Sequence, residues 1–264
     1  MNAFEAVVLG AVQGLTEFIP ISSSGHLVLV PAALGWDRPG LAFDVLLHVA
    51  SLIALLVYFR RDLTAIVVGT IRNEPGARRL GLLLVIGNIP AGLAGLLLAD
   101  YFEASFEDAS AAAIQLGITA VILVAAELVF ARHVAKGREL RGLEDVTVTD
   151  SLAIGVAQAI AIFPGISRSG STIATGLGLR IERDAAARFA FLLAIPALAG
   201  AALLKLPDLT SATLSVGAGV GGFIASLVFS YAAIAGLIRY LRSNTLYPFA
   251  VYCVIAGIVF YLVV

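Results

Sequence analysis

The chain has 264 residues, of which 60% are hydrophobic and 13% are charged, and its formal net charge is −1. A soluble domain carries about 25% charged residues, so this chain has too few charges to cover a surface that faces water. The composition therefore indicates an all-α polytopic membrane protein. No basic cluster with interleaved aromatic residues is present in the sequence, which argues against nucleic-acid binding.

In chain order, six apolar stretches can form full spans, since a spanning helix needs about 20 mostly apolar residues. They are residues 42–59, 80–99, 110–131, 186–205, 214–237 and 246–264. Residues 3–35 and 150–180 are also apolar, but each is interrupted by proline, glycine and serine near its middle. Proline removes a backbone donor and glycine relaxes the backbone, so we predict two re-entrant helix hairpins. Broken backbone at membrane depth must be surrounded by protein or water, which makes the hairpins the expected location of a site.

The two hairpins belong to an internal repeat. When the chain is shifted by 145 positions without gaps, residues 10–25 and 155–170 share seven identities in sixteen positions. The shared residues of the first copy are Gly10, Gln13, Phe18, Ile21, Ser22, Ser24 and Gly25. We divide the single membrane domain 1–264 into repeat one, 1–131, and an inverted repeat two, 150–264. Three spans per repeat is an odd number, so the repeats have opposite orientations and both hairpins are expected near the midplane.

Lysine and arginine residues are concentrated on one side of this six-span topology. Fourteen of the seventeen fall in segments 60–79, 132–141, 180–188 and 239–242. By the positive-inside rule this side is cytoplasmic, which puts both termini outside and predicts a multi-pass protein of the cell membrane. Glu127 is expected at the membrane interface, and His133 is expected to be solvated.

The first polar motif is Gln13-Gly-Leu-Thr-Glu17-Phe-Ile-Pro-Ile-Ser22-Ser23-Ser24-Gly25-His26. A carboxylate at membrane depth is costly unless it is paired, so Glu17 is a functional candidate; the alternative is a residue near a watery hairpin mouth. The second half-helix should begin near Gly25, where free N–H groups and the helix dipole favour an anion such as phosphate. One serine could be a nucleophile beside a base. Alternatively, the serines only cap the helix.

The second motif is Pro164-Gly165-Ile166-Ser167-Arg168-Ser169-Gly170-Ser171-Thr172. Arginine remains charged and offers a planar fork of donors that matches phosphate oxygens. Arg168 is therefore expected to bind phosphate, and the alternative is a structural ion pair with Glu17. Asp44 and His48 could add a metal ligand or a proton carrier, although a capping aspartate and a core histidine are at least as plausible.

Together the two motifs closely resemble the signatures of the undecaprenyl-diphosphate phosphatase family, also called the bacitracin-resistance protein family. The resemblance extends over essentially the whole chain. It implies an integral membrane enzyme that removes one phosphate from a C55 polyprenyl diphosphate lipid, recycling the carrier of cell-wall precursors. The site would open to the outer face. The family has Glu or Gln at the position of Gln13, and it commonly has threonine where this chain has Ser24.

The resemblance also implies roles for individual residues. Ser23 would attack the terminal phosphorus, Glu17 would act as base or metal ligand, and Arg168 would hold the phosphoryl oxygens. His26 would assist, and the covalent intermediate could form on Ser23 or on His26. The remaining residues expected to line the substrate cradle are Gln13, Ser22, Ser24, Gly165, Ser167, Ser169 and Thr172.

No His/Cys cluster in the sequence has zinc spacing, but a diphosphate carries dense negative charge. Mg²⁺ or Ca²⁺ is therefore an expected cofactor, taking oxygens from the diphosphate and from Glu17. The alternative function is a transporter or flippase for a polyprenyl phosphate or another anion, because inverted repeats with broken helices are typical of transporters. The oligomeric state, the metal and the preferred isoprenoid length cannot be predicted from the sequence.

Overall fold

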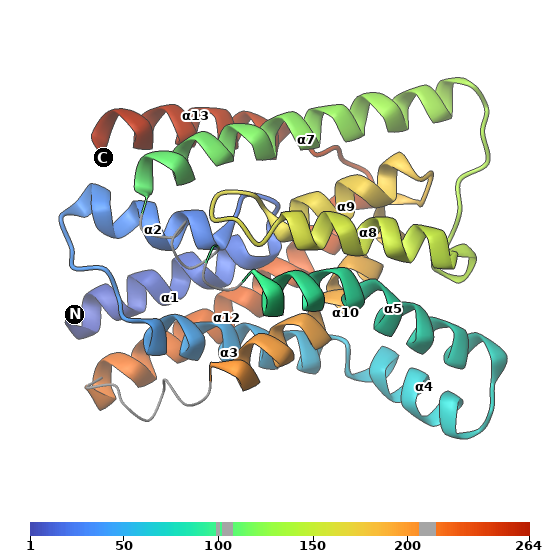
Figure 1. Cartoon of the computed structure of the whole chain (residues 1–264), viewed down its shortest axis with the longest axis horizontal. Coiled ribbons are helices and arrows are strands. Elements are labelled where there is room, and N and C mark those ends of the chain that lie inside the picture. The colour runs from blue at the N-terminus through green and yellow to red at the C-terminus, as the bar shows by residue number, and fades with distance from the viewer. Residues whose placement is uncertain (99–100, 102–107, 206–214) are drawn as a thin grey trace.

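The computed structural model describes residues 1–98, 101, 108–205 and 215–264, and within them the chain forms eleven α-helices and one short 3-10 helix (Figure 1). No strand occurs in these ranges, apart from an isolated bridge between Arg141 and Ile181. The all-helical character predicted from composition is thus confirmed over the described residues. Two expected span limits, at residues 99 and 214, fall outside the described residues.

Five helices are long and apolar enough to cross a membrane: α3 (Leu41–Tyr58), α5 (Pro75–Leu97), α7 (Ala109–Ala135), α10 (Arg183–Leu204) and α12 (Val216–Leu241). The sixth expected span corresponds to α13 (Tyr247–Val263), which has 17 residues and counts as a shorter apolar helix. The loop expected over 60–79 instead contains a 12-residue helix, α4 (Arg60–Ile71). A short 3-10 helix, η1 (Leu143–Asp145), precedes the second broken segment.

Both interrupted segments are pairs of helices joined by a turn. The first pair is α1 (Ala3–Phe18) and α2 (Ser23–Leu34), and the second is α8 (Val148–Ile160) and α9 (Arg168–Gly178). Asn2 with Glu5 and Thr147 with Asp150 form capping boxes that begin α1 and α8. Figure 1 shows the two pairs reaching toward each other from opposite ends of the molecule, with both chain termini at the α1–α2 end.

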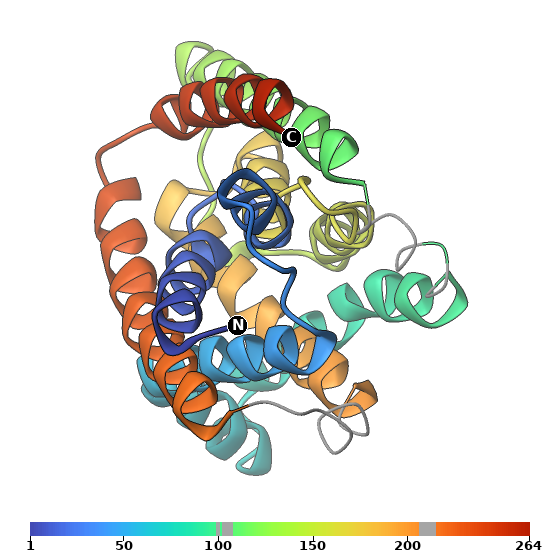
Figure 2. The ribbon, with the colours of Figure 1, turned by 90° about the vertical axis from the view of Figure 1, so that its left-hand side faces the viewer.

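Each hairpin packs on a long helix that comes from the other half of the chain. Helix α1 lies along α12 and α8 lies along α5, while α3, α7, α10 and α13 complete the surround (Figure 2). The closest crossings are between glycines. A Cβ atom at Gly10 would overlap the carbonyl of Gly222, and one at Gly155 would overlap the carbonyl of Gly87. Gly10 and Gly155 are 145 positions apart, the offset of the sequence repeat, so equivalent positions make equivalent close contacts.

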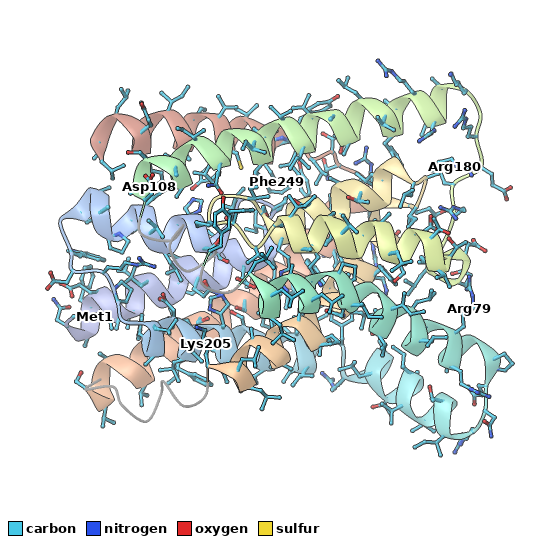
Figure 3. All side chains as sticks on the ribbon, viewed as in Figure 1. Met1, Arg79, Asp108, Arg180, Lys205 and Phe249 are labelled. Carbon is cyan, nitrogen blue, oxygen red and sulfur yellow. The ribbon has the colours of Figure 1, made fainter. Side chains whose placement is uncertain are left out.

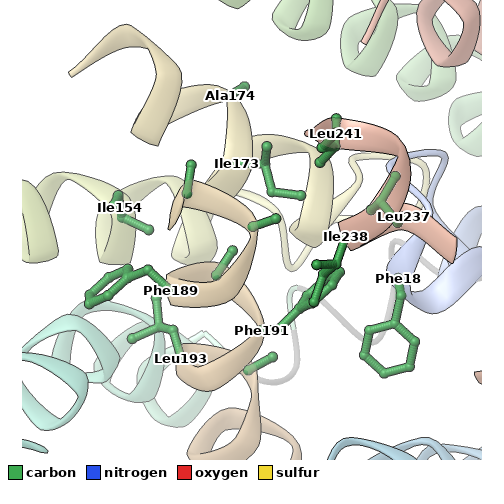
Figure 4. Close-up of a cluster of buried hydrophobic side chains, with 14 of the residues drawn as sticks. Phe18, Ile154, Ile173, Ala174, Phe189, Phe191, Leu193, Leu237, Ile238 and Leu241 are labelled. Carbon is green, nitrogen blue, oxygen red and sulfur yellow. The ribbon is translucent and has the colours of Figure 1, made fainter. Parts of the chain in front are cut away.

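The apolar core joins both hairpins to α10 and α12. Phe18, the last residue of α1, packs edge-on against Phe191 of α10 with ring centroids 5.4 Å apart. Ile154 of α8, Ile173 of α9 and Leu237 of α12 belong to the same cluster of buried side chains (Figure 4). Helix α2 packs instead in two smaller clusters, through Leu27 in one and Val28 and Leu29 in the other. The segments on either side of both turns are therefore anchored by packed side chains, which hold the polar residues on a rigid scaffold.

The two ends of the bundle differ in charge. Figure 3 shows Arg79 and Arg180 at one end, and Met1, Asp108 and Lys205 in the other half of the molecule. The Arg79 end is joined by ion pairs, including Arg188 with Asp62 and a two-armed pair of Arg141 with Asp150 at 2.8 and 3.0 Å.

Glu127 was expected at the interface, but it is buried with 2% exposure. It accepts two hydrogen bonds from Arg183, at 2.5 and 2.6 Å, and one from the Leu246 backbone at 2.7 Å. His133 was expected to be solvated, but its Nε2 lies 3.0 Å from the Gly178 carbonyl oxygen. His133 is thus only partly exposed, and the position of Glu127 relative to a membrane interface stays a prediction. Neighbouring helices bring polar partners that the sequence around each residue does not reveal.

Candidate functional site

The two hairpin turns touch through their backbones. The Oγ atom of Ser22 accepts the N–H of Gly25 in its own hairpin at 3.3 Å and the N–H of Gly165 in the other hairpin at 3.2 Å. A Cβ atom on Gly25 would lie 3.0 Å from the Gly165 Cα, so the lack of a side chain at Gly25 permits this approach. Two segments 143 residues apart are thereby joined by one hydroxyl group.

The second turn is held in place by α7. Thr119, buried with 1% exposure, donates its hydroxyl to the Gly165 carbonyl at 2.8 Å and accepts the Ser167 N–H at 2.9 Å. Gly165 has a φ of 96°, in the region that favours glycine. Thr119 was not among the residues predicted for the site, because an isolated threonine inside an apolar span carries no local signal of such a contact.

Both short inner helices begin where the turns meet. Ser22 caps α2, with an unusual φ of 69°, and Ser167 caps α9 through the Gly170 N–H at 3.0 Å. Helix α2 begins at Ser23, two residues earlier than expected, and α9 begins at Arg168. Ser23 and Arg168 occupy equivalent repeat positions, so the hydroxyl and the guanidinium each extend from the first residue of a helix. Two helix N-termini in one place favour an anion.

Glu17 is the hub of the site. Its side chain is 4% exposed, and its Oε1 atom accepts a hydrogen bond from Arg168. Its Oε2 atom accepts hydrogen bonds from the Ser23 hydroxyl and from Gln13 Nε2, the latter at 2.9 Å. The arginine compensates the buried charge, and the remaining donors satisfy the other oxygen. The structure thus brings together Gln13, Glu17, Ser23 and Arg168.

The other predicted hydroxyls lie around this centre and brace the turns. Ser24 and Ser22 have their Oγ atoms 3.3 Å apart, and those of Ser167 and Ser169 are 3.2 Å apart. Ser169 also donates to the Ile19 carbonyl at 3.3 Å, across the hairpins. The Thr172 hydroxyl donates to the Arg168 carbonyl at 2.8 Å within α9. In the described geometry these groups fix the backbone rather than contact Glu17.

His26 lies behind the serine turn. Its Nδ1 is 2.7 Å from the Ser22 carbonyl oxygen, and its Nε2 is 2.8 Å from the hydroxyl of Tyr252 on α13, whose ring stacks on the imidazole. A carbonyl only accepts, so Nδ1 donates, and in the neutral ring Nε2 accepts from Tyr252. Both ring nitrogens are engaged away from Glu17. The sequence did not reveal Tyr252, which lies 226 residues from His26.

His48 of α3 is the remaining group close to Glu17. Its Nε2 lies 3.7 Å from Glu17 Oε2, the oxygen that also accepts from Ser23. The sequence left open whether His48 is a proton carrier, a metal ligand or a core histidine. Its position beside the carboxylate depends on how α3 packs against α1.

The described residues do not fit a divalent cation held by the protein alone. No group of three His, Cys, Asp or Glu side chains suited to a metal ion occurs among them. Both oxygens of Glu17 already accept hydrogen bonds, one of them from a cationic guanidinium, which disfavours a second cation at the same atom. The expectation of Mg²⁺ or Ca²⁺ therefore rests on the substrate's own oxygens and stays a prediction.

The arrangement of Ser23, Glu17 and Arg168 suggests a type of chemistry. A hydroxyl that donates to a carboxylate is a nucleophile beside its base, and an adjacent arginine can bind phosphoryl oxygens. Fold and site together define the class: a polytopic helical membrane protein in which a serine and an arginine meet at a buried carboxylate.

The chain belongs to the bacitracin resistance protein BacA family, whose model matches residues 6–259. Among its relatives, proteins named undecaprenyl-diphosphatase are similar over nearly their full lengths. The one from Thermomicrobium roseum is 42% identical, covering 100% of this chain and 99% of the relative. The one from Methanosphaera stadtmanae is 40% identical, covering 98% and 97%. The one from Pelobacter propionicus is 42% identical, covering 97% and 95%.

Proposed function

We propose that this protein is an undecaprenyl-diphosphatase, which removes the terminal phosphate of undecaprenyl diphosphate and so recycles the lipid carrier for cell-wall synthesis. The family membership and the names of the relatives support the substrate. The single observation that carries the chemistry is the Ser23 hydroxyl donating to a Glu17 carboxylate that also pairs with Arg168.

In the proposed reaction, the terminal phosphate lies between the first residues of α2 and α9. Arg168 and the free N–H groups of both helices stabilise the charge that develops on the phosphoryl oxygens, which is the main requirement of phosphoryl transfer. Ser23 attacks phosphorus as its proton passes to Glu17, and the lipid monophosphate leaves. Water then hydrolyses the phosphoserine, with Glu17 as base. In the apo arrangement Arg168 pairs with Glu17, so the substrate would take over part of that pairing.

His26 has a supporting part in this proposal. It donates to the Ser22 carbonyl, which fixes the turn that carries Ser23. The hydroxyls of Ser22 and Ser169 bond across the two turns, and those of Ser24, Ser167 and Thr172 brace the turn or helix to which each belongs. We assign the covalent intermediate to Ser23, because its hydroxyl contacts the base while both nitrogens of His26 are engaged elsewhere.

We further propose an inverted repeat of 1–131 and 150–264, with six spans, two re-entrant hairpins and α13 as the sixth span. Seventeen helical residues are about 25 Å long at 1.5 Å per residue, near the lower limit for a span. Equivalent caps at Ser22 and Ser167 and equivalent crossings at Gly10 and Gly155 support the repeat. With the arginine-rich end in the cytoplasm, the α1–α2 hairpin lies toward the outer face of the cell membrane, where the site would open.

We propose that Mg²⁺ or Ca²⁺ takes part bound to the diphosphate itself, where it would neutralise charge on the leaving group. No described side chain is assigned as its ligand, and no step above depends on it. The second candidate function, a flippase or transporter for a polyprenyl phosphate, is favoured by the two hairpins that approach from opposite ends. Lipid movement across vesicles without phosphate release would favour it over hydrolysis.

The decisive experiment measures phosphate release from undecaprenyl diphosphate by the purified protein in detergent, with and without a chelator. We expect turnover by the natural chain and a loss on the order of 10³-fold or more in Ser23→Ala, because the attacking oxygen is removed. Ser110→Ala is the matched control, since Ser110 is an exposed serine of α7. Turnover in Ser23→Ala equal to that of the control would refute the assignment, and equal rates with chelator would refute the role of the cation.

A further inference from the structure

His48 connects the buried carboxylate to a more accessible part of the molecule. The Nε2 atom of His48 lies 3.7 Å from Glu17 Oε2, and the two side chains are 32% and 4% exposed. The same Oε2 atom accepts the Ser23 hydroxyl. A proton that leaves Ser23 therefore arrives on the carboxylate oxygen that faces His48, and not on the oxygen that pairs with Arg168.

The ring of His48 is oriented by its own helix. Its Nδ1 lies 2.7 Å from the carbonyl oxygen of Asp44, one turn earlier in α3. Since a carbonyl oxygen only accepts, Nδ1 carries the hydrogen, and in the neutral ring the lone pair is on Nε2, toward Glu17. A neutral imidazole and an ionised carboxylate then face each other without a proton between them. Their contact becomes a hydrogen bond only after Glu17 has received a proton.

We propose that His48 takes the proton that Glu17 receives from Ser23 and releases it from the site; this inference rests on the proposed function. The Ser23 O–H bond breaks as the Oγ–P bond forms, and the proton moves to Glu17 Oε2. The P–O bond to the lipid monophosphate breaks with its electron pair, and that group leaves as an anion. The proton then moves from Glu17 to His48 Nε2, which leaves Glu17 ionised.

The second half of the reaction, hydrolysis of the phosphoserine, releases no further proton from Glu17 to His48. Water gives one proton to the restored Glu17 carboxylate as its oxygen attacks phosphorus. Glu17 returns that proton to the departing Ser23 oxygen. One proton is released for each diphosphate hydrolysed, and it is the one held by His48. Without His48, Glu17 would lose its proton more slowly after the first step, and the activation of water would be delayed.

The charged groups around His48 allow this role. On α3 itself, the Asp44 carboxylate is one turn away, with Arg38 acting on it electrostatically, and its Oδ1 atom is buried without a partner among the described residues. Helix α1 contributes Glu17, and α9 contributes Arg168 through Glu17. Helix α12 contributes only hydroxyls at this depth, since Ser226 donates to the Leu47 carbonyl. Helix α10 ends beside its cap Lys205, and its described arginines and Asp184 lie at its other end.

The test compares the natural chain with His48→Gln, which keeps a polar side chain but cannot carry the proton. We expect kcat to fall by about tenfold to hundredfold, somewhat below the loss for a direct general base, with KM changed by less than about threefold. Added imidazole should restore part of the rate in His48→Ala, since the side chain is partly accessible.

His133→Gln is the matched control, because His133 contacts Gly178 at the opposite end of the bundle. A melting curve for each variant separates lost folding from lost chemistry. If the natural chain hydrolyses the substrate and His48→Gln has the same kcat, the relay is overturned and the proposed function stands. A rise in KM alone, or no rescue by imidazole, would also overturn it. No hydrolysis by the natural chain would overturn both.

Discussion

The ion pair between Arg168 and Glu17 can be tested as a structural element and as part of the active site. In Arg168→Gln, Glu17 would stay buried at 4% exposure without its cation. Breaking a buried pair by removing one partner costs about 3–5 kcal/mol. Glu17 keeps hydrogen bonds from Gln13 and Ser23, and the Arg168 side chain is itself 17% exposed, so we expect the lower limit, about 3 kcal/mol.

The chain offers its own reporter for this measurement. Cys253 is the single cysteine and is 0% exposed, so a thiol-reactive fluorescent dye labels it only when the protein unfolds. A loss of about 3 kcal/mol should lower the melting temperature by about 6–12 °C in a chain of this size. Arg61→Gln is the matched control, because Arg61 is exposed on α4. Phosphate release measured on the same samples should be lost in Arg168→Gln and kept in the control.

The double variant Glu17→Gln/Arg168→Gln distinguishes the two contributions. Removing both charges leaves no unpaired ion, so the melting temperature should recover most of the loss while activity stays absent. A melting temperature of Arg168→Gln within about 2 °C of the natural chain, together with natural turnover, would refute both the energetic and the catalytic reasoning.

Two further predictions concern the supports of the site. Gly165→Ala would combine a φ of 96° with a Cβ atom 2.6 Å from that of Gln115, so we expect its free energy of unfolding to fall by about 3 kcal/mol or more. At Gly178 an added Cβ atom would meet no atom within 4 Å, so the free energy of unfolding of Gly178→Ala should lie within about 1 kcal/mol of that of the natural chain. Equal melting of the two glycine variants would contradict this. Burial raises the pKa of Asp150, but hydrogen bonds from Arg141 and Thr147 outweigh it and hold that pKa below its usual range. Because the folded pKa is depressed, Asp150→Asn should be less stable at pH 7 by about 1–3 kcal/mol, and the difference should shrink as the pH falls below about 4. A difference that stays constant down to pH 3 would contradict the electrostatic origin.

Much of the local structure follows from short-range rules. Pro20 and Gly165 break the apolar stretches where the turns occur, since proline lacks a donor and only glycine tolerates the φ of 96° at position 165. Ser22 and Ser167 cap the following helices, as serine does wherever backbone donors are free. These features depend on a few neighbouring residues, so the sequence contains what is needed to predict them.

Features that depend on helix packing were missed or left open. Nothing in the sequence distinguishes among the roles considered for His48, and no local pattern marks the contacts of Thr119 and Tyr252. Helix α4 was also missed, because its 12 residues begin with Arg60, Arg61 and Asp62 and are too few for a membrane span. An expected span of 19 residues proved to be a 17-residue helix at α13, since Pro248 and its neighbours set the start.

The sequence by itself predicted a helical membrane protein with two interrupted segments, and its two polar motifs singled out Glu17, the serine turn and Arg168 as candidates for the site. Composition, proline and glycine placement and side-chain type act locally, so they can be interpreted without coordinates. Only the tertiary structure decided that Ser23, Arg168 and His48 surround one carboxylate and that His26 is turned away toward Tyr252. Apart from Ser23, which lies in the same hairpin as Glu17, these contacts join different helices, and their distances depend on helix rotation and depth, which are set by packing of the whole core.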